Sequence, residues 1–260
     1  MLYIILLIIL ILHLLFTYNN KEFFNNSKKK TLYIYWAQGF NNAPYVVKKC
    51  LISWEKLNPT WKIIKLTDNN INNYINIKKE IPNIDNKKIS KTALSDIIRI
   101  FLLEKYGGLW VDATTFCNVP LDDWLHKYLD SGFFAFDNIN LFSSWFIYSN
   151  KNNYITKMLK IKIIEYWNIN DKTTEYFWLH KLFSELYKNN KKFGDLWNKT
   201  PKKSAYDGFL WLKLTEKQCN NKKFIKKLLN DKKIPLYKLT YKFYIKKYKN
   251  NCINYLIDNI

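Results

Sequence analysis

The side chains best suited to chemistry lie in one stretch of the sequence, between Ser95 and Asp112. Asp96 and Arg99 are three positions apart, so they share a face of any helix that contains them. Arg99 is the only arginine in the chain, and every other strong base is a lysine. A guanidinium offers a planar fork to phosphate or carboxylate, which an ammonium cannot do. These residues predict either an anion-binding group or a local Asp96–Arg99 ion pair that stabilises the helix.

A glycine pair and a short apolar run lead from this segment to Asp112. Gly107 and Gly108 permit a left-handed helix cap and a sharp turn into a strand. A carboxylate at the carboxyl end of a buried α/β strand lies where open sheets bind ligands. Such a carboxylate can hold a hard cation that bridges two phosphates, or it can cap the following turn.

The elements that position these groups are those of an α/β fold. Residues Thr31 to Trp36 are rich in β-branched and aromatic side chains and predict a strand. Pro44 to Leu57 has apolar residues at helical spacing, and Trp61 to Leu66 predicts a second strand. A strand, a helix and a strand in this order predict a parallel sheet.

The rest of the chain continues this pattern. Ser90 to Tyr106 has one apolar stripe and is the clearest helix, with Asp96 and Arg99 placed off that stripe. Leu109 to Val111 predicts a short buried strand that ends at Asp112. Further predicted elements are strands over Phe133–Phe136 and Trp145–Tyr148, helices from Tyr154 through Tyr166 and again through Tyr187, and a covering helix and strand from Lys222.

Composition predicts one domain with a large core. The chain has 260 residues, of which 48% are hydrophobic and 18% aromatic. The net charge of +21 is compatible with a polyanionic partner, but the lysines are scattered, which favours compositional bias and no nucleic-acid partner. Neither a CxxC pair nor a zinc spacing occurs among the cysteines, which indicates isolated buried thiols. These cysteines are Cys50, Cys117, Cys219 and Cys252.

The N-terminus predicts a membrane tether. Met1 to Phe16 is apolar except for His13, and no small-residue cleavage site follows it. We therefore expect a transmembrane signal anchor over residues 1–18, a linker over 19–30 and one catalytic domain over 31–260. The protein would be a single-pass membrane protein. Lysines after the span favour a cytosolic domain by the positive-inside rule, yet lysine is so common that a Golgi- or ER-type lumenal location stays open.

Several of these segments together resemble the capsular polysaccharide synthesis protein family. That family is related to the glycosyltransferase family 32 enzymes, which carry an Asp-x-Asp motif. The likeness covers about residues 31 to 190, and the order and spacing of its motifs are specific. The segments that carry it are Ile34–Gly39, Ala43-Pro44 with Lys48–Cys50, Ser95–Arg99, Tyr106–Thr114, Ser143–Ile147 and Glu175–Phe177.

The resemblance implies a GT-A, Rossmann-like fold with added C-terminal helices. It implies transfer of a hexosyl group from a UDP- or GDP-sugar to a hydroxyl of a glycan or polysaccharide. A divalent cation, Mn²⁺ or Mg²⁺, would assist the transfer. Retention of configuration follows by analogy with family 32 alone.

The resemblance also assigns roles to residues. Trp36 would lie by the nucleotide base, Asp96 and Arg99 by the donor sugar and its phosphates, and Asp112 by the metal and ribose. Gly108 and Thr114 complete the expected nucleotide-sugar site. Thr114 stands where Asp-x-Asp has its second aspartate, and a hydroxyl is a weaker cation ligand than a carboxylate.

Two further residues are candidates for the acceptor side. Trp145 is either a sugar-contacting ring or a core tryptophan, and Glu175 is either an acceptor contact or a solvated helix residue. His180 follows three apolar residues and is expected to be a packed histidine. The alternative to an enzyme is a catalytically silent, membrane-anchored protein that binds a glycan or a nucleotide with the same fold. The sequence leaves the oligomeric state open.

Overall fold

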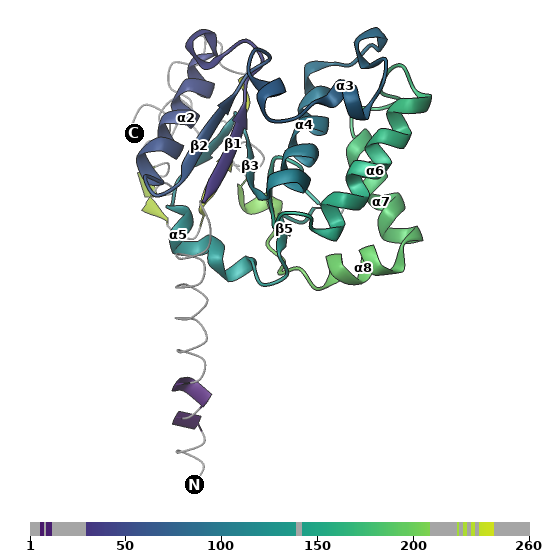
Figure 1. Ribbon diagram of the computed structural model, residues 1–260. Helices are drawn as coiled ribbons and strands as arrows, with labels where there is room; N and C mark the ends of the chain where they lie inside the picture. The colour runs from purple at the N-terminus through teal and green to yellow at the C-terminus, as the bar shows by residue number, and fades with distance from the viewer. Residues whose placement is uncertain are drawn as a thin grey trace.

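The computed structural model describes residues 6–7, 9–11, 30–138, 142–208, 223, 226–227, 230–231 and 234–241. A five-stranded sheet lies at the centre, in the order β2-β1-β3-β6-β5. Figure 1 shows helices on both sides of this sheet, so the predicted α/β class is confirmed. Its strands are β1 (Thr31–Tyr35), β2 (Lys62–Leu66), β3 (Gly108–Asp112), β5 (Phe133–Ala135) and β6 (Phe146–Ser149).

Three strands are parallel and end at the same edge of the sheet. β1 pairs with both β2 and β3, and Tyr35 is opposite Leu66 on one side and Asp112 on the other. Helix α2 (Tyr45–Leu57) makes the crossover from β1 to β2, as the sequence predicts. β6 runs antiparallel to β3, and β5 runs antiparallel to β6. Asp112 therefore lies at the carboxyl edge of the parallel strands.

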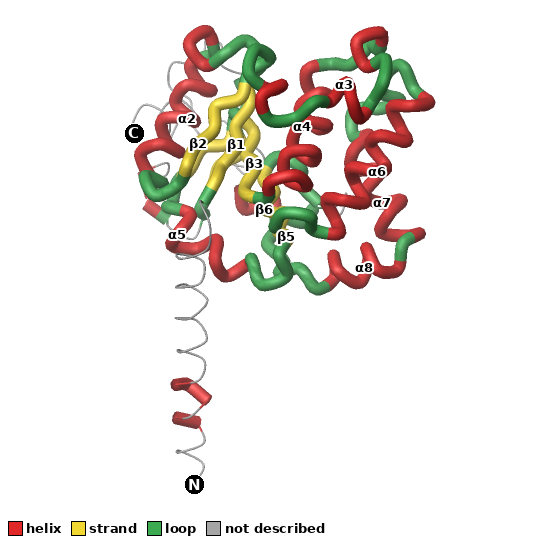
Figure 2. Tube along the Cα trace, viewed as in Figure 1, coloured by secondary structure: helices red, strands yellow, loops and turns green. Residues whose placement is uncertain are grey.

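The two faces of the sheet bury separate cores because side chains alternate along each strand. Tyr33 of β1 and Trp110 of β3 face a core built with helices α4 (Lys91–Tyr106), α6 (Tyr154–Ile169) and α7 (Trp178–Asn189). Ile34 and Val111 face the opposite core, which includes α2 and α5 (Leu121–Trp124). The tube view shows the strands between these two helical layers (Figure 2).

Helix α4 starts and stops where its sequence predicts. The Ser90 side chain caps it by accepting a hydrogen bond from the Ala93 amide at 3.1 Å. Gly107 ends it with φ of 70°, a left-handed conformation that glycine adopts at low cost. A Cβ on Gly107 would lie 2.6 Å from the Lys151 amide nitrogen, so close packing also requires a glycine there. This turn sends the chain directly into β3.

The helices after β6 cover the α4 side of the sheet. α6 and α7 confirm the two predicted helical segments, and α8 (Lys191–Asn198) follows without a separate prediction. Asn190 separates α7 from α8, and its side chain accepts a hydrogen bond from the Phe193 amide at 3.0 Å. The short helices α3 (Ile77–Glu80) and α5 were not predicted either, because four residues are too few for a periodic pattern.

A second, two-stranded sheet joins the C-terminal part to the site. β4 (Thr115–Cys117) follows β3 after one turn and pairs antiparallel with β7 (Leu236–Lys238). Thr115 is opposite Lys238 in this ladder. The predicted covering strand after Lys222 is thus found, whereas its pairing with β4 has no signal in the sequence.

The predicted anchor over 1–18 lies largely outside the described residues. Of these positions, 6–7 and 9–11 are described, and they are helical. Within the described parts of the chain, none of the helices combines the length and the hydropathy needed to cross a bilayer. The linker over 19–30 also lies outside the described residues, apart from Lys30, which pairs with Asp122 at 2.8 Å.

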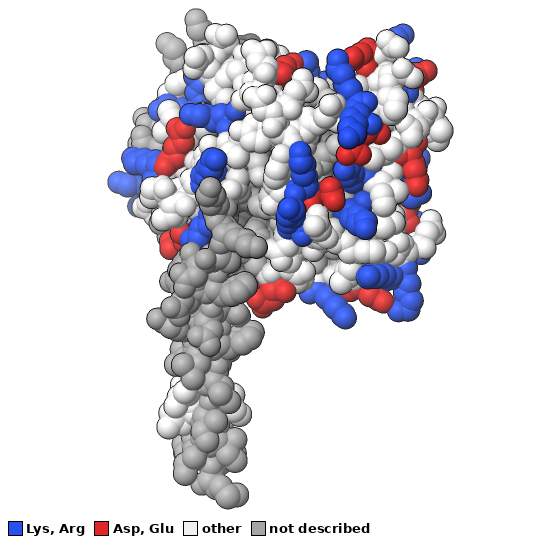
Figure 3. Space-filling model, in the orientation of Figure 1, with Lys and Arg blue, Asp and Glu red and all other residues white. Residues whose placement is uncertain are grey.

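The charged side chains are scattered and the described cysteines are buried thiols, as the sequence predicts. Figure 3 shows lysine and arginine side chains spread over the visible face with acidic side chains among them. Cys50 and Cys117 are buried free thiols, while Cys219 and Cys252 lie outside the described residues.

Candidate functional site

A cavity of about 190 Å³ opens at the carboxyl edge of β1 and β3. Trp36 and Gln38 line it from the loop after β1, and Arg99 lines it from α4. Asp112 and Thr114 line it from the end of β3 and the following turn. Four of the residues predicted to bind a nucleotide-sugar, Trp36, Arg99, Asp112 and Thr114, are thus brought to one cavity.

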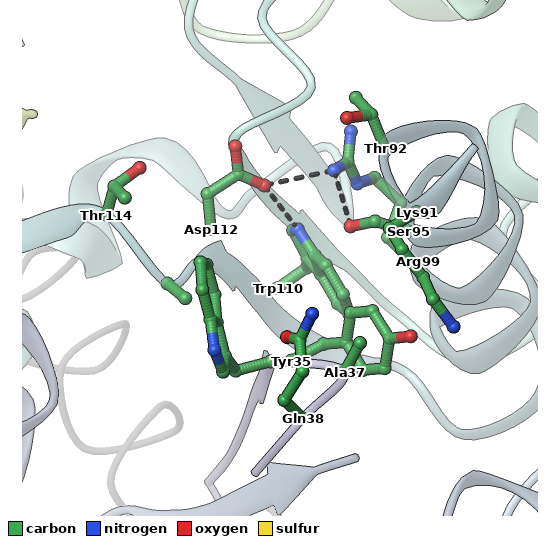
Figure 4. Close-up of a pocket in the computed structure, with 12 residues that line it drawn as sticks. Tyr35, Ala37, Gln38, Lys91, Thr92, Ser95, Arg99, Trp110, Asp112 and Thr114 are labelled. Atoms are coloured by element: carbon green, nitrogen blue, oxygen red, sulfur yellow. Dashed lines mark hydrogen bonds and ion pairs between the residues drawn. The ribbon is translucent and has the colours of Figure 1, made fainter. Parts of the chain in front are cut away.

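Arg99 connects helix α4 with strand β3. Its Nη1 donates to Asp96 Oδ1, and its Nη2 donates to Ser95 Oγ and to Asp112 Oδ1, both at 3.0 Å. Figure 4 shows the guanidinium between Ser95 and the Asp112 carboxylate. The guanidinium carbon also lies 5.2 Å from the centre of the Trp110 ring. The predicted Asp96–Arg99 ion pair is therefore present, and the anion-binding role of Arg99 stays a prediction.

The helix face that carries Asp96 and Arg99 is buried in the structure. The side chains of Arg99 and Asp96 are only 4% and 8% exposed, although they lie off the apolar stripe of α4. Helix α7 supplies the reason, because Trp178 packs over Asp96 and donates a hydrogen bond from Nε1 to Oδ2 at 3.0 Å. Buried charges that are paired and hydrogen-bonded in this way are held in fixed positions.

Asp96 positions Arg99 and does not line the cavity. Burial raises the pKa of Asp96 to about 6, although the Arg99 cation and the hydrogen bond from Trp178 oppose this rise. Both carboxylate oxygens are engaged by protein donors. In the structure Asp96 contacts Arg99 and Trp178, and the donor contact that the resemblance implies stays a prediction.

Asp112 is surrounded by hydrogen-bond donors. Oδ1 accepts from Arg99 and from Trp110 Nε1, the latter at 3.1 Å, and Oδ2 lies 3.3 Å from Lys238 Nζ. Burial acts to raise the pKa of Asp112, but Arg99 and Lys238 together hold it below its ordinary value. Its amide donates to the Trp145 carbonyl at 2.8 Å, which fixes the backbone. Asp112 is therefore an ionised carboxylate in a rigid setting.

Gly108 packs closely against strand β1. It lies at the start of β3, four residues before Asp112, which along a strand is about 13 Å away. Its φ is +108°, and a Cβ would lie 2.8 Å from the Thr31 carbonyl oxygen. The close packing of β3 against β1 therefore requires a glycine here, and the expected nucleotide-sugar contact stays a prediction.

The two residues predicted for the acceptor side do not meet at the cavity. Trp145 is 5% exposed and stacks on Phe136 with ring centres 4.9 Å apart, which agrees with the core alternative. Glu175 is exposed and pairs with Lys181 at 3.1 Å, so it is solvated as one alternative predicts, but it lies before α7 and not in a helix. Trp145 nevertheless supports the site through its backbone carbonyl.

His180 is packed, as predicted, and its environment keeps it neutral. Its ring lies 5.1 Å from that of Phe142 and 5.3 Å from that of Phe177. Burial, followed by the nearby Arg99 cation, lowers the pKa of His180 to about 4. The histidine is therefore an uncharged neighbour of the site near pH 7.

Three side chains that support the site were not predicted from the sequence. Trp110 stands two positions before Asp112 on one strand, so the alternation of a strand could have placed both on the same face. Trp178 begins α7, and its contact with Asp96 depends on how two helices pack. Lys238 lies on β7 and reaches both Asp112 and Thr114. Only a prediction of tertiary structure could have found the last two.

The residues at this site do not match the expected divalent-cation site. Oδ1 of Asp112 already accepts two hydrogen bonds, and Oδ2 faces the Lys238 ammonium. Thr114 Oγ1 accepts from the same ammonium at 2.6 Å. Among the described residues, no three His, Cys, Asp or Glu side chains gather closely enough to hold a metal ion. The cation that the donor set accommodates here is an ammonium.

The fold and the site together define an α/β protein with a guanidinium–carboxylate pair at the carboxyl edge of its parallel strands. The chain belongs to the capsular polysaccharide synthesis protein family, which its sequence matches over residues 11–258. The resemblance seen in the sequence motifs is therefore confirmed.

Two known proteins show more limited similarity. The O-glycosyltransferase braB of Annulohypoxylon truncatum is 27% identical over 104 residues. That match covers 36% of this chain and 25% of the relative, so the chain spans about a quarter of the curated relative's length. A solved structure named PaToxG Glycosyltransferase is 18% identical with a TM-score of 0.44, over 64% of this chain and 73% of that one.

Proposed function

We propose that this protein is a glycosyltransferase of the GT-A type. It transfers a hexosyl group from a UDP- or GDP-sugar to a hydroxyl of a glycan or polysaccharide. The observation that carries the proposal is the contact of Arg99 with Asp112 at the carboxyl ends of the parallel strands. Both residues line a cavity that Trp36 also lines. Membership of the capsular polysaccharide synthesis family supports the same activity.

The physical argument concerns the leaving group. Breaking the bond between a sugar and a nucleoside diphosphate builds negative charge on the terminal phosphate. Fixed positive groups placed beside that charge stabilise the transition state without having to reorganise. Arg99 is such a group, because Asp96, Ser95 and Asp112 hold its guanidinium in one orientation. Retention of configuration remains part of the proposal by analogy.

The acceptor is proposed to approach past the segment before α7. Tyr176 and Phe177 are 71% and 49% exposed, and their rings meet edge to face at 4.9 Å. Partial burial and then the Asp112 carboxylate raise the pKa of Tyr176. Exposed aromatic faces suit the apolar faces of sugar rings.

The proposal is tested by donor turnover. Purified protein is incubated with a panel of UDP- and GDP-sugars, with and without Mn²⁺, and the released nucleotide is measured. Turnover of at least one donor, lost in Asp112→Asn and kept in the surface control Asp171→Asn, supports the activity. Asp171 is a fair control because its side chain is 87% exposed. Absence of turnover with every donor in the panel would reject the enzyme.

A second candidate is a protein that binds the nucleotide or the glycan without turnover. The observation that favours it is Thr114, which stands in place of an acidic ligand and is engaged by Lys238. The same panel separates the two candidates, because tight nucleotide binding without any release of sugar is the result expected of the silent protein.

The N-terminal segment is proposed to tether the domain to a membrane. Residues 1–16 are apolar except for His13, and the domain begins at β1. The side of the membrane on which the domain lies is left open by this proposal. Partition of the full chain into detergent, compared with a truncated chain, measures the tether directly.

A further inference from the structure

Lys238 lies where a divalent cation would be expected in an enzyme of the proposed kind. Its Nζ donates to Thr114 Oγ1 at 2.6 Å and lies 3.3 Å from Asp112 Oδ2. These two oxygens belong to the first and third residues of the Asp-Ala-Thr segment, the positions at which an Asp-x-Asp motif presents its acidic ligands. We propose that Lys238 replaces the metal, and that its ammonium binds the diphosphate of the donor.

The fold delivers this lysine by a specific pairing. β7 is held antiparallel to β4, with Thr115 opposite Lys238 and Tyr237 opposite Phe116. The Leu239 amide donates to the Thr114 carbonyl at 2.8 Å, next to the side-chain contact. The backbone on both sides of the contact is therefore fixed, and the ammonium does not depend on a flexible segment for its position.

The side chain is placed to interact with both the protein and a ligand. Lys238 is 18% exposed and Asp112 is 23% exposed, so neither is sealed inside the core. Thr114 lines the cavity, and Lys238 hydrogen-bonds to it. An ammonium has three donors, and the two oxygens named here engage two of them, which leaves one N–H for a phosphate oxygen.

Arg99 and Lys238 each contact one of the two carboxylate oxygens of Asp112. Arg99 binds Oδ1 and Lys238 faces Oδ2, so two cations flank one carboxylate. A divalent ion on the same carboxylate would stand beside both cations and be repelled by them. A diphosphate, by contrast, is attracted to this pair. The arrangement thus favours an anion over an additional cation.

The step assigned to Lys238 rests on the proposed transferase activity. The bond from the sugar C1 to the diphosphate oxygen breaks, and its electron pair stays on that oxygen. The acceptor hydroxyl oxygen forms the new bond to C1, and its proton passes to the leaving diphosphate. Lys238 neutralises the charge that develops on the diphosphate and forms no covalent bond.

The test is nucleotide binding with and without metal. UDP and GDP are titrated calorimetrically into the full-length protein in EDTA and again in Mn²⁺. We expect binding in EDTA to match that in Mn²⁺, and Lys238→Met to weaken it in EDTA by roughly 10-fold or more, the size of one charge-assisted contact. Lys238→Arg should bind within a few-fold of wild type.

A surface-lysine variant and a folding check serve as controls for the binding experiment. Lys191→Met removes a 90% exposed lysine and should change nothing, which excludes a general charge effect. If Lys238→Met fails to fold, as judged by circular dichroism, the arginine variant and the EDTA comparison still decide the question. Binding that requires Mn²⁺, or a Lys238→Met variant that binds Mn²⁺ and nucleotide better than wild type, would overturn the inference and leave the transferase proposal standing. No binding of either nucleotide under any condition would overturn both.

Discussion

Arg99 and Asp112 lie thirteen positions apart in the sequence, and Nη2 of the first meets Oδ1 of the second at 3.0 Å. The contact joins the middle of α4 to the end of β3 across the turn at Gly107 and Gly108. A guanidinium is suited to this bridge, because its separate N–H groups bind Asp96 and Asp112 at the same time. Its orientation is set before any ligand arrives.

Arg99→Lys should impair the enzyme although it conserves the charge. A lysine cannot bind Asp96, Asp112 and a phosphate oxygen in one plane. Loss of one charge-assisted bond in a dry site costs about 2–4 kcal/mol, which is roughly a 30- to 1000-fold loss in rate. The measurement is kcat/KM for the donor found in the panel, together with a thermal melt. Near-normal kcat/KM with a slightly lower melting temperature would show that Arg99 only stabilises the helix.

Asp112→Asn should retain the fold and lose activity. The amide keeps one oxygen for Arg99 but turns an N–H₂ group toward Lys238, so the ammonium loses its anionic partner. We expect a loss of about 100-fold or more in turnover. Destabilisation of about 1–3 kcal/mol is expected, since one partially exposed acceptor is replaced. Urea unfolding measures the destabilisation. A wild-type rate in the variant would show that Asp112 has no part in the mechanism.

The sequence predicts the layout of this site better than its interactions. Strand β3, helix α4 and the glycine turn between them follow from local patterns, so Arg99 and Asp112 could be placed near the same sheet edge in advance. The burial of the Asp96–Arg99 pair could not be predicted, because it depends on Trp178, which lies 82 positions after Asp96 and packs on it from another helix. Lys238 is one of many scattered lysines, and only the β4–β7 pairing distinguishes it.

The same limit applies to two other predicted site residues. Gly108 belongs to a motif that carries the resemblance, but a motif does not separate residues that touch ligands from those that shape the backbone. Trp145 shares this ambiguity, since an aromatic side chain near the end of a strand packs inward as readily as it lines a pocket. The close approach of Gly108 to the Thr31 carbonyl and the burial of Trp145 both depend on how the whole domain packs.

Gly108→Ala should destabilise the protein without changing the chemistry of the folded fraction. An alanine at φ of +108° is strained, and its Cβ would approach the Thr31 carbonyl to 2.8 Å. We expect a loss of about 1–3 kcal/mol in the free energy of unfolding. Gly39→Ala is the matched control, because its φ is +84° but nothing lies within 4 Å of the added Cβ. A lower nucleotide affinity in the folded Gly108 variant would restore its predicted ligand role.

Deletion of residues 1–28 should release the domain from membranes. The described domain starts its sheet at Thr31, and Lys30 already pairs with Asp122, so the cut leaves these contacts intact. Full-length protein should partition with detergent or vesicles, and the truncated protein should remain in the aqueous phase with the same melting temperature. Equal partition of both proteins, or failure of the truncated protein to fold, would contradict the assignment of a tether.

The pH dependence of the enzyme should report the ionisation of Asp96. Burial raises its pKa from 3.8 to about 6, so lowering the pH from 7 to 5 protonates it and weakens its hold on Arg99. Donor kcat/KM should therefore fall on the acid side with an apparent pKa near 6. Asp112, whose pKa lies below its ordinary value, stays ionised through this range and does not produce the same fall.

Stability should change with pH in the opposite sense to activity. Because the folded-state pKa of Asp96 lies above its unfolded value, the folded protein holds this proton more tightly than the unfolded chain. The stabilisation is fully present below pH 3.8 and is lost as the pH rises through about 6. Asp96→Asn cannot ionise, so it should lack both the acid fall in kcat/KM and this component of the stability profile. An unchanged acid limb in the Asn variant would assign that limb to another group and would remove Asp96 as the residue that positions Arg99.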